Sequence, residues 1–492
     1  MAPLELAGGR IGTNLAGSGG HVQRRRHQLV WGNLNFRNRS RFPGSFRTLV
    51  ATGVIVVSLM FGLDACHHSS VELAVTVTLL DPGWPDKEFS DWRDHEVAEF
   101  TRETGIQVKL LPAPETALDQ LSLWRRLLQS GPDAPDVYAI DVIWPAILAD
   151  EFIDLKPYLA QDTAADFPWL VSNDTVNGRL VALPYHADAG LLFYRTDLLR
   201  EYGYSSPPRT WDELEKMAAR IQAGERAKGK KDFWGFVWQG AAAEGLTCNA
   251  LEWQASEGGG RIIEEDGTIS VNNPQTIRAW DRAARWVGSI SPPGVVAYRE
   301  WDALNLWRSG NAAFMRNWPT SYIVSTSEGS SVRTRFAVTL LPRGQVGHSA
   351  TLGGASLSIS PHSRHPKEAI ALVRYLCRRD VQLARSLVTS QPPTIPDLYD
   401  DPKALKANPH FALLEQLFRE GLVVRPSTVT GQKYTDVSKA YFDAVHSVLT
   451  REKSAAKAAA DLEQQLVQIT GMKIRALGTA VPSDRNPSQA RR

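Results

Sequence analysis

The chain has 492 residues, a formal net charge of +2 and 43% hydrophobic residues. This composition agrees with a globular protein, and the length is enough for two lobes with separate cores. The excess of positive charge comes from the N-terminus: without residues 1–65, which hold eight Arg, Glu5 and Asp64, the net charge would change from +2 to −4. The remainder has no basic block of the kind that nucleic acid needs, so nucleic acid is excluded as a partner.

The N-terminal residues have the pattern of an export signal. A basic segment containing Arg24-Arg25-Arg26 precedes an apolar run at residues 48–63, whose length suits a signal peptide better than a membrane span. Leu63-Asp64-Ala65-Cys66 follows and is similar to a bacterial lipobox, in which the cysteine is lipidated and becomes the mature N-terminus. We therefore predict a signal peptide and leader at residues 1–65 and a lipid-anchored linker at residues 66–70. A plain N-terminal membrane anchor is the alternative, and a later translation start is compatible with the long leader.

The first part of the mature chain alternates between strand and helix patterns. Strands are predicted at residues 71–79, 106–110 and 135–140, and helices at residues 89–104 and 118–128. This order implies a parallel sheet with right-handed crossovers, and ligands of such sheets sit beyond the carboxyl ends of the strands. Trp84 follows the first strand, and Asp141 and Trp144 follow the third. Two aromatic rings and a carboxylate are therefore expected at one edge.

A second well-specified stretch surrounds a conspicuous carboxylate. Asn177-Gly178 is a turn dipeptide, and a short buried strand is predicted after it at residues 180–184. Tyr185 and Asp188 come next, before a second apolar strand at residues 190–194. A carboxylate between two apolar strands costs burial energy unless it has a partner. Asp188 is therefore a candidate ligand contact.

The rest of the chain is mostly helical, with a few strands that deliver polar or aromatic residues. Strands are predicted at residues 310–315, 336–341 and 357–360, with Trp318 after the first and Gly353-Gly354 before the last. Thr210 and Glu213 match a capping box at the start of a helix. Helices dominate after Pro366 except at the turn that carries Arg425. Cys248 and Cys377 are interpreted as two buried thiols, and a disulfide between them is the alternative.

Residues at the strand ends supply the chemistry that a sugar needs. A sugar has hydroxyls around its edge and apolar C–H faces, so its site needs aromatic planes for the faces and carboxylates, amides or Arg for the edge. The candidate planes are Trp84, Tyr185 and Trp318, and the candidate edge groups are Asp141, Asp188 and Arg425, with Glu88 and Asn317 as additions. His186 is interpreted as a structural neighbour. No Walker loop, zinc spacing or Gly-x-Ser-x-Gly elbow appears in the sequence, so we predict no cofactor and no metal.

Each candidate also has a structural alternative. The chain has fifteen Trp, and any one of them can pack in a core. Asp141 can cap the helix that follows it, and Arg425 can simply pair with an acid. The positions at strand ends favour the ligand interpretation for the group as a whole.

Two motifs in the chain resemble segments of the extracellular solute-binding proteins that serve ABC importers of sugars. Residues 194–199 read Tyr-Arg-Thr-Asp-Leu-Leu and residues 207–214 read Pro-Pro-Arg-Thr-Trp-Asp-Glu-Leu. Within that family, the chain resembles the trehalose and maltose binding branch. The matching positions are Asp141, Asp188, Trp318, Gly353-Gly354 and Arg425. Ala355 stands where that pattern has a tryptophan, which implies a different sugar or a larger or differently placed ligand.

The resemblance implies an α/β, two-lobe periplasmic-binding-protein fold with a hinge between the lobes. The N-terminal lobe would hold residues 71–184 and 336–372, the C-terminal lobe residues 185–335 and 373–479, and residues 480–492 would form a disordered tail. The implied protein is a monomeric, membrane-anchored extracytoplasmic lipoprotein and not an enzyme. It would bind a disaccharide such as trehalose or maltose, with Gly354 among the contacts, and deliver it to the ABC permease subunits. A binding protein for a non-sugar solute and a glycoside hydrolase, which also uses two carboxylates, are the alternatives.

Overall fold

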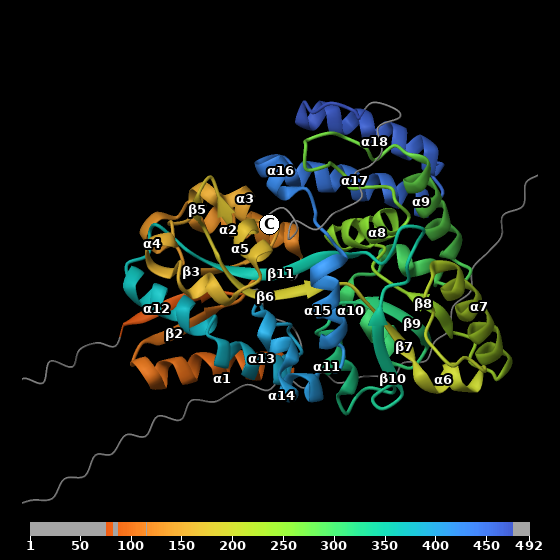
Figure 1. The fold of residues 1–492 in the computed structure, drawn as a ribbon, viewed down its shortest axis with the longest axis horizontal. Coiled ribbons are helices and arrows are strands. Elements are labelled where there is room, and N and C mark those ends of the chain that lie inside the picture. Colours follow the sequence, from red (N-terminus) through yellow and green to blue (C-terminus); the bar gives the residue numbers. More distant parts are fainter. Residues whose placement is uncertain (1–74, 82–86, 115, 476–492) are drawn as a thin grey trace, which may run out of the picture. The chain divides into compact units, whose positions relative to one another are not determined.

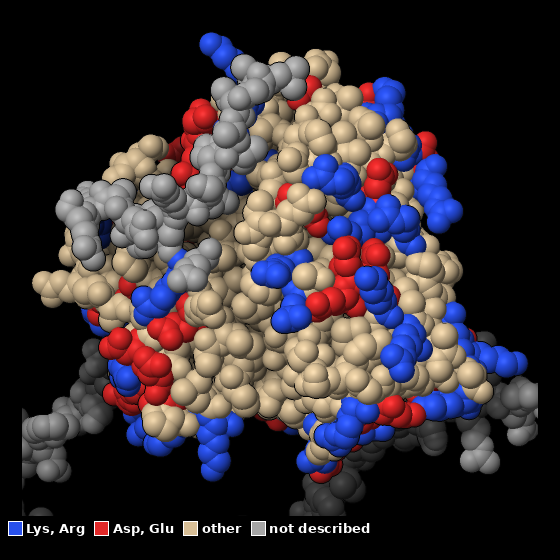
Figure 2. Space-filling model, turned by 45° about the vertical axis from the view of Figure 1, so that its right-hand side comes forward, with Lys and Arg blue, Asp and Glu red and all other residues tan. Residues whose placement is uncertain are grey.

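The computed structural model describes residues 75–81, 87–114 and 116–475, which lie in one compact unit of the chain. The predicted signal peptide, the Cys66 lipidation site, the 66–70 linker, Trp84 and the 480–492 tail lie outside the described residues. Among the helices of the described ranges, none combines the length and the apolar character that crossing a bilayer requires. On the face of the molecule shown in Figure 2, acidic and basic side chains are interspersed.

The first sheet begins with three parallel strands, as the sequence predicts. β1 (Thr76–Leu80) pairs with β2 (Gln107–Leu111) and β3 (Val137–Asp141). β11 (Ala350–Ile359) then pairs antiparallel with both β3 and β6 (Leu183–Ala189), and β12 (Leu422–Val423) pairs in parallel with the start of β11. β11 thus lies at the centre of the sheet and pairs with β3, β6 and β12 (Figure 1 shows its place beside β6).

Both faces of the first sheet are covered by helices. On one face, Val137 and Leu357 pack in a core with Phe100 and Leu372, which lie on α1 (Lys87–Thr104) and α12 (Pro366–Leu376). On the other face, Ile140 packs with residues of α2 (Ala117–Leu128). The smaller elements of this part are α3 (Pro145–Leu148), α4 (Lys156–Leu159), α5 (Pro168–Asn173), β4 (Thr175–Val176) and β5 (Arg179–Leu180). The predicted turn between β4 and β5 is confirmed, because Asn177 and Gly178 both have positive φ.

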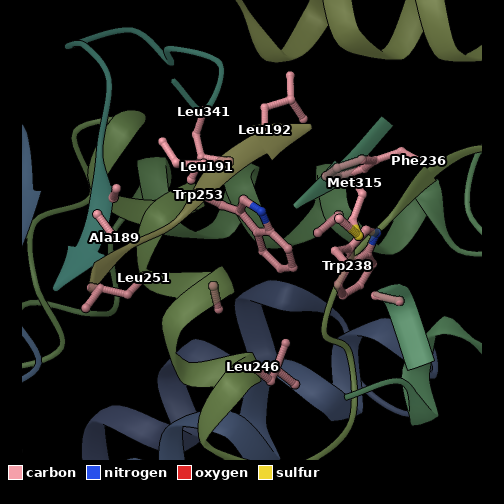
Figure 3. Packing of buried hydrophobic residues seen from close by; sticks show 14 of the residues in the cluster. Ala189, Leu191, Leu192, Phe236, Trp238, Leu246, Leu251, Trp253, Met315 and Leu341 are labelled. Atoms are coloured by element: carbon pink, nitrogen blue, oxygen red, sulfur yellow. The ribbon is translucent and has the colours of Figure 1, made fainter. Parts of the chain in front are cut away.

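The second sheet has four strands in the order β10-β7-β9-β8. They are β7 (Leu191–Arg195), β8 (Trp234–Val237), β9 (Ala312–Asn317) and β10 (Phe336–Leu340). Its main covering helices are α7 (Trp211–Ala227), α8 (Glu244–Ser256), α9 (Pro274–Trp286) and α10 (Glu300–Arg308). Figure 3 shows Trp238 and Trp253 in the core between β9 and α8, with their rings edge to face at 5.0 Å. Thr210 caps α7 as predicted, because its hydroxyl accepts the Glu213 N–H, but the Glu213 carboxylate accepts the N–H of Arg209, one residue before the position that a capping box requires.

The remaining helices lie mostly late in the chain. They are α6 (Thr196–Glu201), α11 (Ser321–Thr326), α13 (Arg379–Thr389), α14 (Pro402–Ala407), α15 (Phe411–Glu420), α16 (Ser427–Thr430), α17 (Tyr434–Leu449) and α18 (Ala455–Thr470). α17 and α18 pack against each other and against α9 (Figure 1). Cys248 on α8 and Cys377 after α12 are both free thiols, as predicted, but only Cys248 is fully buried and Cys377 is partly buried.

Two of the predicted lobe boundaries change once the strands are paired. The sequence predicts residues 336–372 in the first lobe, but β10 pairs along its length with β7 and therefore belongs to the second sheet. It also predicts residues 373–479 in the second lobe, but Arg385 of α13 forms a buried ion pair with Glu96 of α1 at 2.7 Å. The chain thus passes between the sheets at Gly190, after β6, and again between β10 and β11.

One buried ion pair contacts the chain at both of these connections between the sheets. The Arg316 guanidinium donates to Glu252 at 3.0 Å, and these side chains are 1% and 0% exposed. The same Glu252 carboxylate accepts the backbone N–H of Thr351, at the start of β11, at 3.2 Å. Gly190 lies against the pair on the other side: a Cβ there would overlap Glu252 and come within 2.7 Å of Arg316. The ion pair therefore holds the two connecting segments side by side.

Gly190→Ala should lower the free energy of unfolding by about 1–3 kcal/mol, because the added methyl group must displace a buried ion pair that has no free space around it. Chemical denaturation of the two proteins measures the difference. Gly294→Ala is the matched control, because a Cβ at Gly294 meets only Tyr298 at an ordinary 3.6 Å. Equal stability of Gly190→Ala and Gly294→Ala would contradict the close packing at Gly190.

Candidate functional site between the two sheets

The register of β11 brings the two predicted carboxylates onto one face of the first sheet. Ala355 pairs with Asp141 on one side and with His186 on the other, while Gly353 pairs with Asp188. Directly paired residues point to the same face, and so do residues two apart along a strand. Asp141 and Asp188 therefore project from the same face, on opposite sides of β11.

Asp188 does not lie between two strands, as the sequence suggests, but inside one. β6 runs without a break from Leu183 to Ala189 because β11 supplies pairing partners up to Ala189. The whole strand is buried, so the polar residue is held in place by backbone pairing on a buried strand. This explains how a carboxylate comes to be fixed in an apolar setting.

Arg425 lies next to Asp141 because β12 extends the same sheet. Leu422 and Val423 pair with the start of β11, and Arg425 follows two residues later. Its guanidinium donates to the Leu352 carbonyl at 3.0 Å, to Asp141 at 3.3 Å and to Glu244 of α8 at 2.9 Å. The arginine thus connects the first sheet to a helix that covers the second one.

Trp318 covers the centre of the site. A Cβ on Gly353 would lie 2.9 Å from the Trp318 ring and 3.1 Å from the Asp188 Cβ, so the ring lies over Gly353 and beside Asp188. The Arg316 guanidinium lies 4.2 Å from the centroid of the same ring. Trp318 itself is only partly buried. Among the predicted ligand contacts, Asp141, Asp188, Trp318 and Arg425 therefore come together. Trp84 lies outside the described residues.

Asp188 is a buried carboxyl group without a hydrogen-bond donor among the described residues. It is 6% exposed, its Oδ1 atom has no partner, and its Oδ2 atom lies 3.6 Å from Nε2 of His186. Burial raises the pKa of Asp188 well above its usual range, and the Asp141 charge adds to this against the opposing effect of Arg316. Burial also raises the pKa of Asp141, although Arg425 opposes it. Both carboxyl groups can accept hydrogen bonds from an uncharged ligand.

The other predicted contacts have different surroundings. Tyr185 donates its hydroxyl to Glu96 at 3.1 Å, and the Arg385 guanidinium covers its ring at 3.8 Å, so this side chain packs within the first lobe. Gly354 has φ +120°, and a Cβ there would overlap the His186 carbonyl, so glycine is required by the close approach of β6. Glu88 lies on α1, and its side chain is outside the described residues. Ligand contact by these three residues remains a prediction.

The predicted position of Trp144 is wrong. The sequence predicts it at the ligand edge with Asp141, but it is 1% exposed and packs edge to face against Trp124 at 5.7 Å. The chain turns directly after β3, where the Asp141 carboxylate accepts the Ile143 N–H at 3.1 Å. This turn carries Trp144 into the core under α2.

Three polar residues of the site were not found from the sequence. Arg316 and Glu252 form the buried pair behind Trp318, and Glu244 fixes Arg425. His186, which the sequence analysis interprets as a structural neighbour, lies beside Asp188. A signal did exist for Arg316, which interrupts the apolar strand before Asn317, but its partner could not be read without the fold.

Comparisons with known proteins identify the family of the chain. Residues 87–383 match the family described as bacterial extracellular solute-binding protein. A probable ABC transporter-binding protein of Deinococcus radiodurans is 45% identical over 374 residues, which cover 76% of this chain and 89% of that protein. The solved structure of maltose-bound MalE3 of T. maritima is 34% identical, with a TM-score of 0.75 over 80% of this chain and 100% of that one.

More distant solved structures share the fold. A solute-binding protein of an ABC transporter from Thermotoga lettingae is 21% identical, with a TM-score of 0.72 over 81% of this chain and all of that one. These matches confirm the predicted two-lobe α/β fold class of periplasmic sugar-binding proteins. The chain therefore belongs to the family of bacterial extracellular solute-binding proteins, which are the solute-binding components of ABC transporters and not enzymes.

Proposed function

We propose that this protein captures a sugar, a disaccharide such as trehalose or maltose, between its two lobes and delivers it to the permease subunits of an ABC importer. The observation that carries the proposal is the buried Asp188 carboxyl group, whose Oδ1 atom has no donor, on the same face as Asp141 and beside the Trp318 ring. A sugar hydroxyl can supply the donor that Asp188 Oδ1 lacks. The indole plane suits the apolar face of a sugar ring.

The charges of the site favour an uncharged ligand over an anion. Arg425 is engaged with Asp141 and Glu244, and Arg316 is engaged with Glu252. Neither guanidinium is therefore available to balance a carboxylate or phosphate on the ligand. The maltose in the T. maritima MalE3 structure, a protein 34% identical to this chain, supports the same class of ligand.

Closure of the two lobes around the sugar would complete the cycle. Asp141 and Asp188 belong to the first sheet, whereas Trp318 follows β9 of the second sheet. A ligand that touches both sets of residues stabilises the closed arrangement, and closure presents a surface formed by both lobes to the permease. The Arg316–Glu252 pair, where the chain passes between the sheets, is a suitable pivot.

Asp188→Asn should raise the Kd for the bound sugar about tenfold or more, because an amide nitrogen in place of one carboxyl oxygen leaves a sugar hydroxyl without its acceptor in a buried site, which costs roughly 1–3 kcal/mol. The sugar-free variant should be at least as stable as the unmodified protein, because an unpaired buried carboxyl group has been removed. Titration calorimetry against a panel of disaccharides, with nitrophenyl glycosides to detect hydrolysis, measures binding and turnover. Unchanged affinity in Asp188→Asn, or turnover of any glycoside, would contradict the proposal.

Asp174→Asn is the matched control for this experiment. Asp174 is also fully buried and its Oδ2 atom has no hydrogen-bond partner, and burial raises its pKa to about 7. It lies near Ser356, which projects from the opposite face of β11 to Ala355. Asp174→Asn should therefore leave the Kd for sugar unchanged.

Trp318→Ala should weaken sugar binding roughly tenfold, because about 1.5 kcal/mol of apolar burial is lost with the ring. Trp318→Phe keeps an aromatic plane and should recover part of the affinity. Both values come from the same calorimetric titrations. If Trp318→Ala and Trp318→Phe bind sugar equally well, the ring does not cover the ligand.

We also propose that Cys66 carries the lipid that holds the protein at the extracytoplasmic face of the membrane. Cells that are fed a palmitate analogue should label the unmodified protein, and Cys66→Ala should remove the label. Cys248→Ala, which changes a buried thiol within α8, should keep it. Label that survives in Cys66→Ala would contradict the lipoprotein proposal, and it would leave the proposed sugar binding untouched.

A further inference from the structure

His186 belongs to the ligand-facing row of the first sheet. It pairs with Ala355, which pairs on its other side with Asp141, so the three side chains form one row across the sheet. β6 has an irregularity at this point, because Ser356 pairs with Pro184 and Ala355 with His186. Tyr185 is thus the one residue of this stretch without a partner on β11. His186 and Asp188 lie beyond it, two residues apart on the strand, and therefore share a face.

The His186 imidazole has hydrogen-bonding capacity that the protein leaves unused. The residue is 9% exposed, and its Nδ1 atom has no partner in the part of the chain that the structure describes. Its Nε2 atom lies 3.6 Å from Asp188, too far for a good hydrogen bond. Burial, with the Arg385 charge, lowers the pKa of His186 to about 3, so the ring is neutral and offers one donor and one acceptor.

The residues between the two polar ends of this row are small or partly exposed. Ala355 carries only a methyl group and is partly exposed, and the Asp141 side chain is 28% exposed. A flat ring that lies over Ala355 can therefore reach Asp141 at one edge and His186 with Asp188 at the other. The unused atoms, His186 Nδ1 and Asp188 Oδ1, both belong to that second edge.

We propose that His186 is a ligand-contacting and specificity-determining residue, which together with Asp188 holds one hydroxyl edge of a sugar ring lying over Ala355 while Asp141 holds the other. This inference rests on the proposed sugar-binding function. It narrows the ligand to an uncharged sugar with hydroxyl groups at both edges of the ring. At Nδ1 a neutral imidazole can either donate to a sugar hydroxyl or accept from one, depending on its tautomer, whereas a carboxylate in its place could only accept.

His186→Phe tests the role of the ring nitrogens, because it keeps a planar ring and removes both of them. With a sugar that the unmodified protein binds, Kd should rise about tenfold, since a ligand hydroxyl is left without its partner in a buried site. His186→Gln restores a neutral donor and acceptor and should recover part of the affinity. His410→Phe is the matched control: His410 is equally a buried neutral histidine with unpartnered nitrogens, but it packs against Tyr322 and Phe411.

Three further measurements distinguish the loss of a ligand contact from misfolding of the variant. Ala355→Leu fills the space over β11 and should weaken binding, whereas Ala355→Ser should not. Among monodeoxy analogues of the bound sugar, one should bind the unmodified protein weakly and bind His186→Phe with no further loss, which identifies the contacted hydroxyl. Thermal unfolding of each variant without sugar confirms that it is folded.

The outcomes separate this inference from the proposed function. If His186→Phe and Ala355→Leu keep the affinity of the unmodified protein while Asp188→Asn loses it, sugar binding stands and the role of His186 is overturned. If the unmodified protein binds no sugar in the panel, the proposed function fails and this inference fails with it. Losses in His186→Phe and Ala355→Leu, but not in His410→Phe or Ala355→Ser, support it.

Discussion

The pairing of β11 with β3 on one side and β6 on the other is the constraint on which the site depends. It places Asp141, Ala355 and His186 in one row, with Asp188 beside Gly353. A shift of either strand by one residue would turn its carboxylate to the opposite face, into a core. The glycines secure this register, because a side chain at Gly353 would meet Trp318 and one at Gly354 would meet the β6 backbone.

Ion pairs connect this sheet to the rest of the structure. Arg425 ties Asp141 to Glu244 on α8, and the Arg316–Glu252 pair holds both segments that pass between the sheets. Such buried pairs add little net stability compared with apolar side chains, but each partner strongly constrains the position of the other. The protein thus uses these buried charges to position groups, whereas the Oδ1 atom of the nearby Asp188 carboxyl group has no hydrogen-bond partner among the described residues.

The sequence predicts the part of the fold that follows from local patterns. The parallel strands, the Asn177-Gly178 turn and the Thr210 N-cap of α7 follow from periodicity and turn chemistry. The convergence of Asp141 with Asp188, Trp318 and Arg425 follows from strand ends and from the family resemblance. Long-range pairing could not be read in this way. β6 is buried along its whole length, so no alternation reveals which residues face the ligand, and Arg316 finds its partner Glu252 64 residues away.

The contact between Arg425 and Asp141 joins residues that are 284 positions apart. A growing chain therefore has no complete site until synthesis has passed Arg425 and β12 has joined the first sheet. The Asp141 carboxylate therefore lacks its guanidinium partner until most of the chain has been made. A fragment that ends before Arg425 contains the strand that carries Asp141 but not the ion pair that joins it to α8.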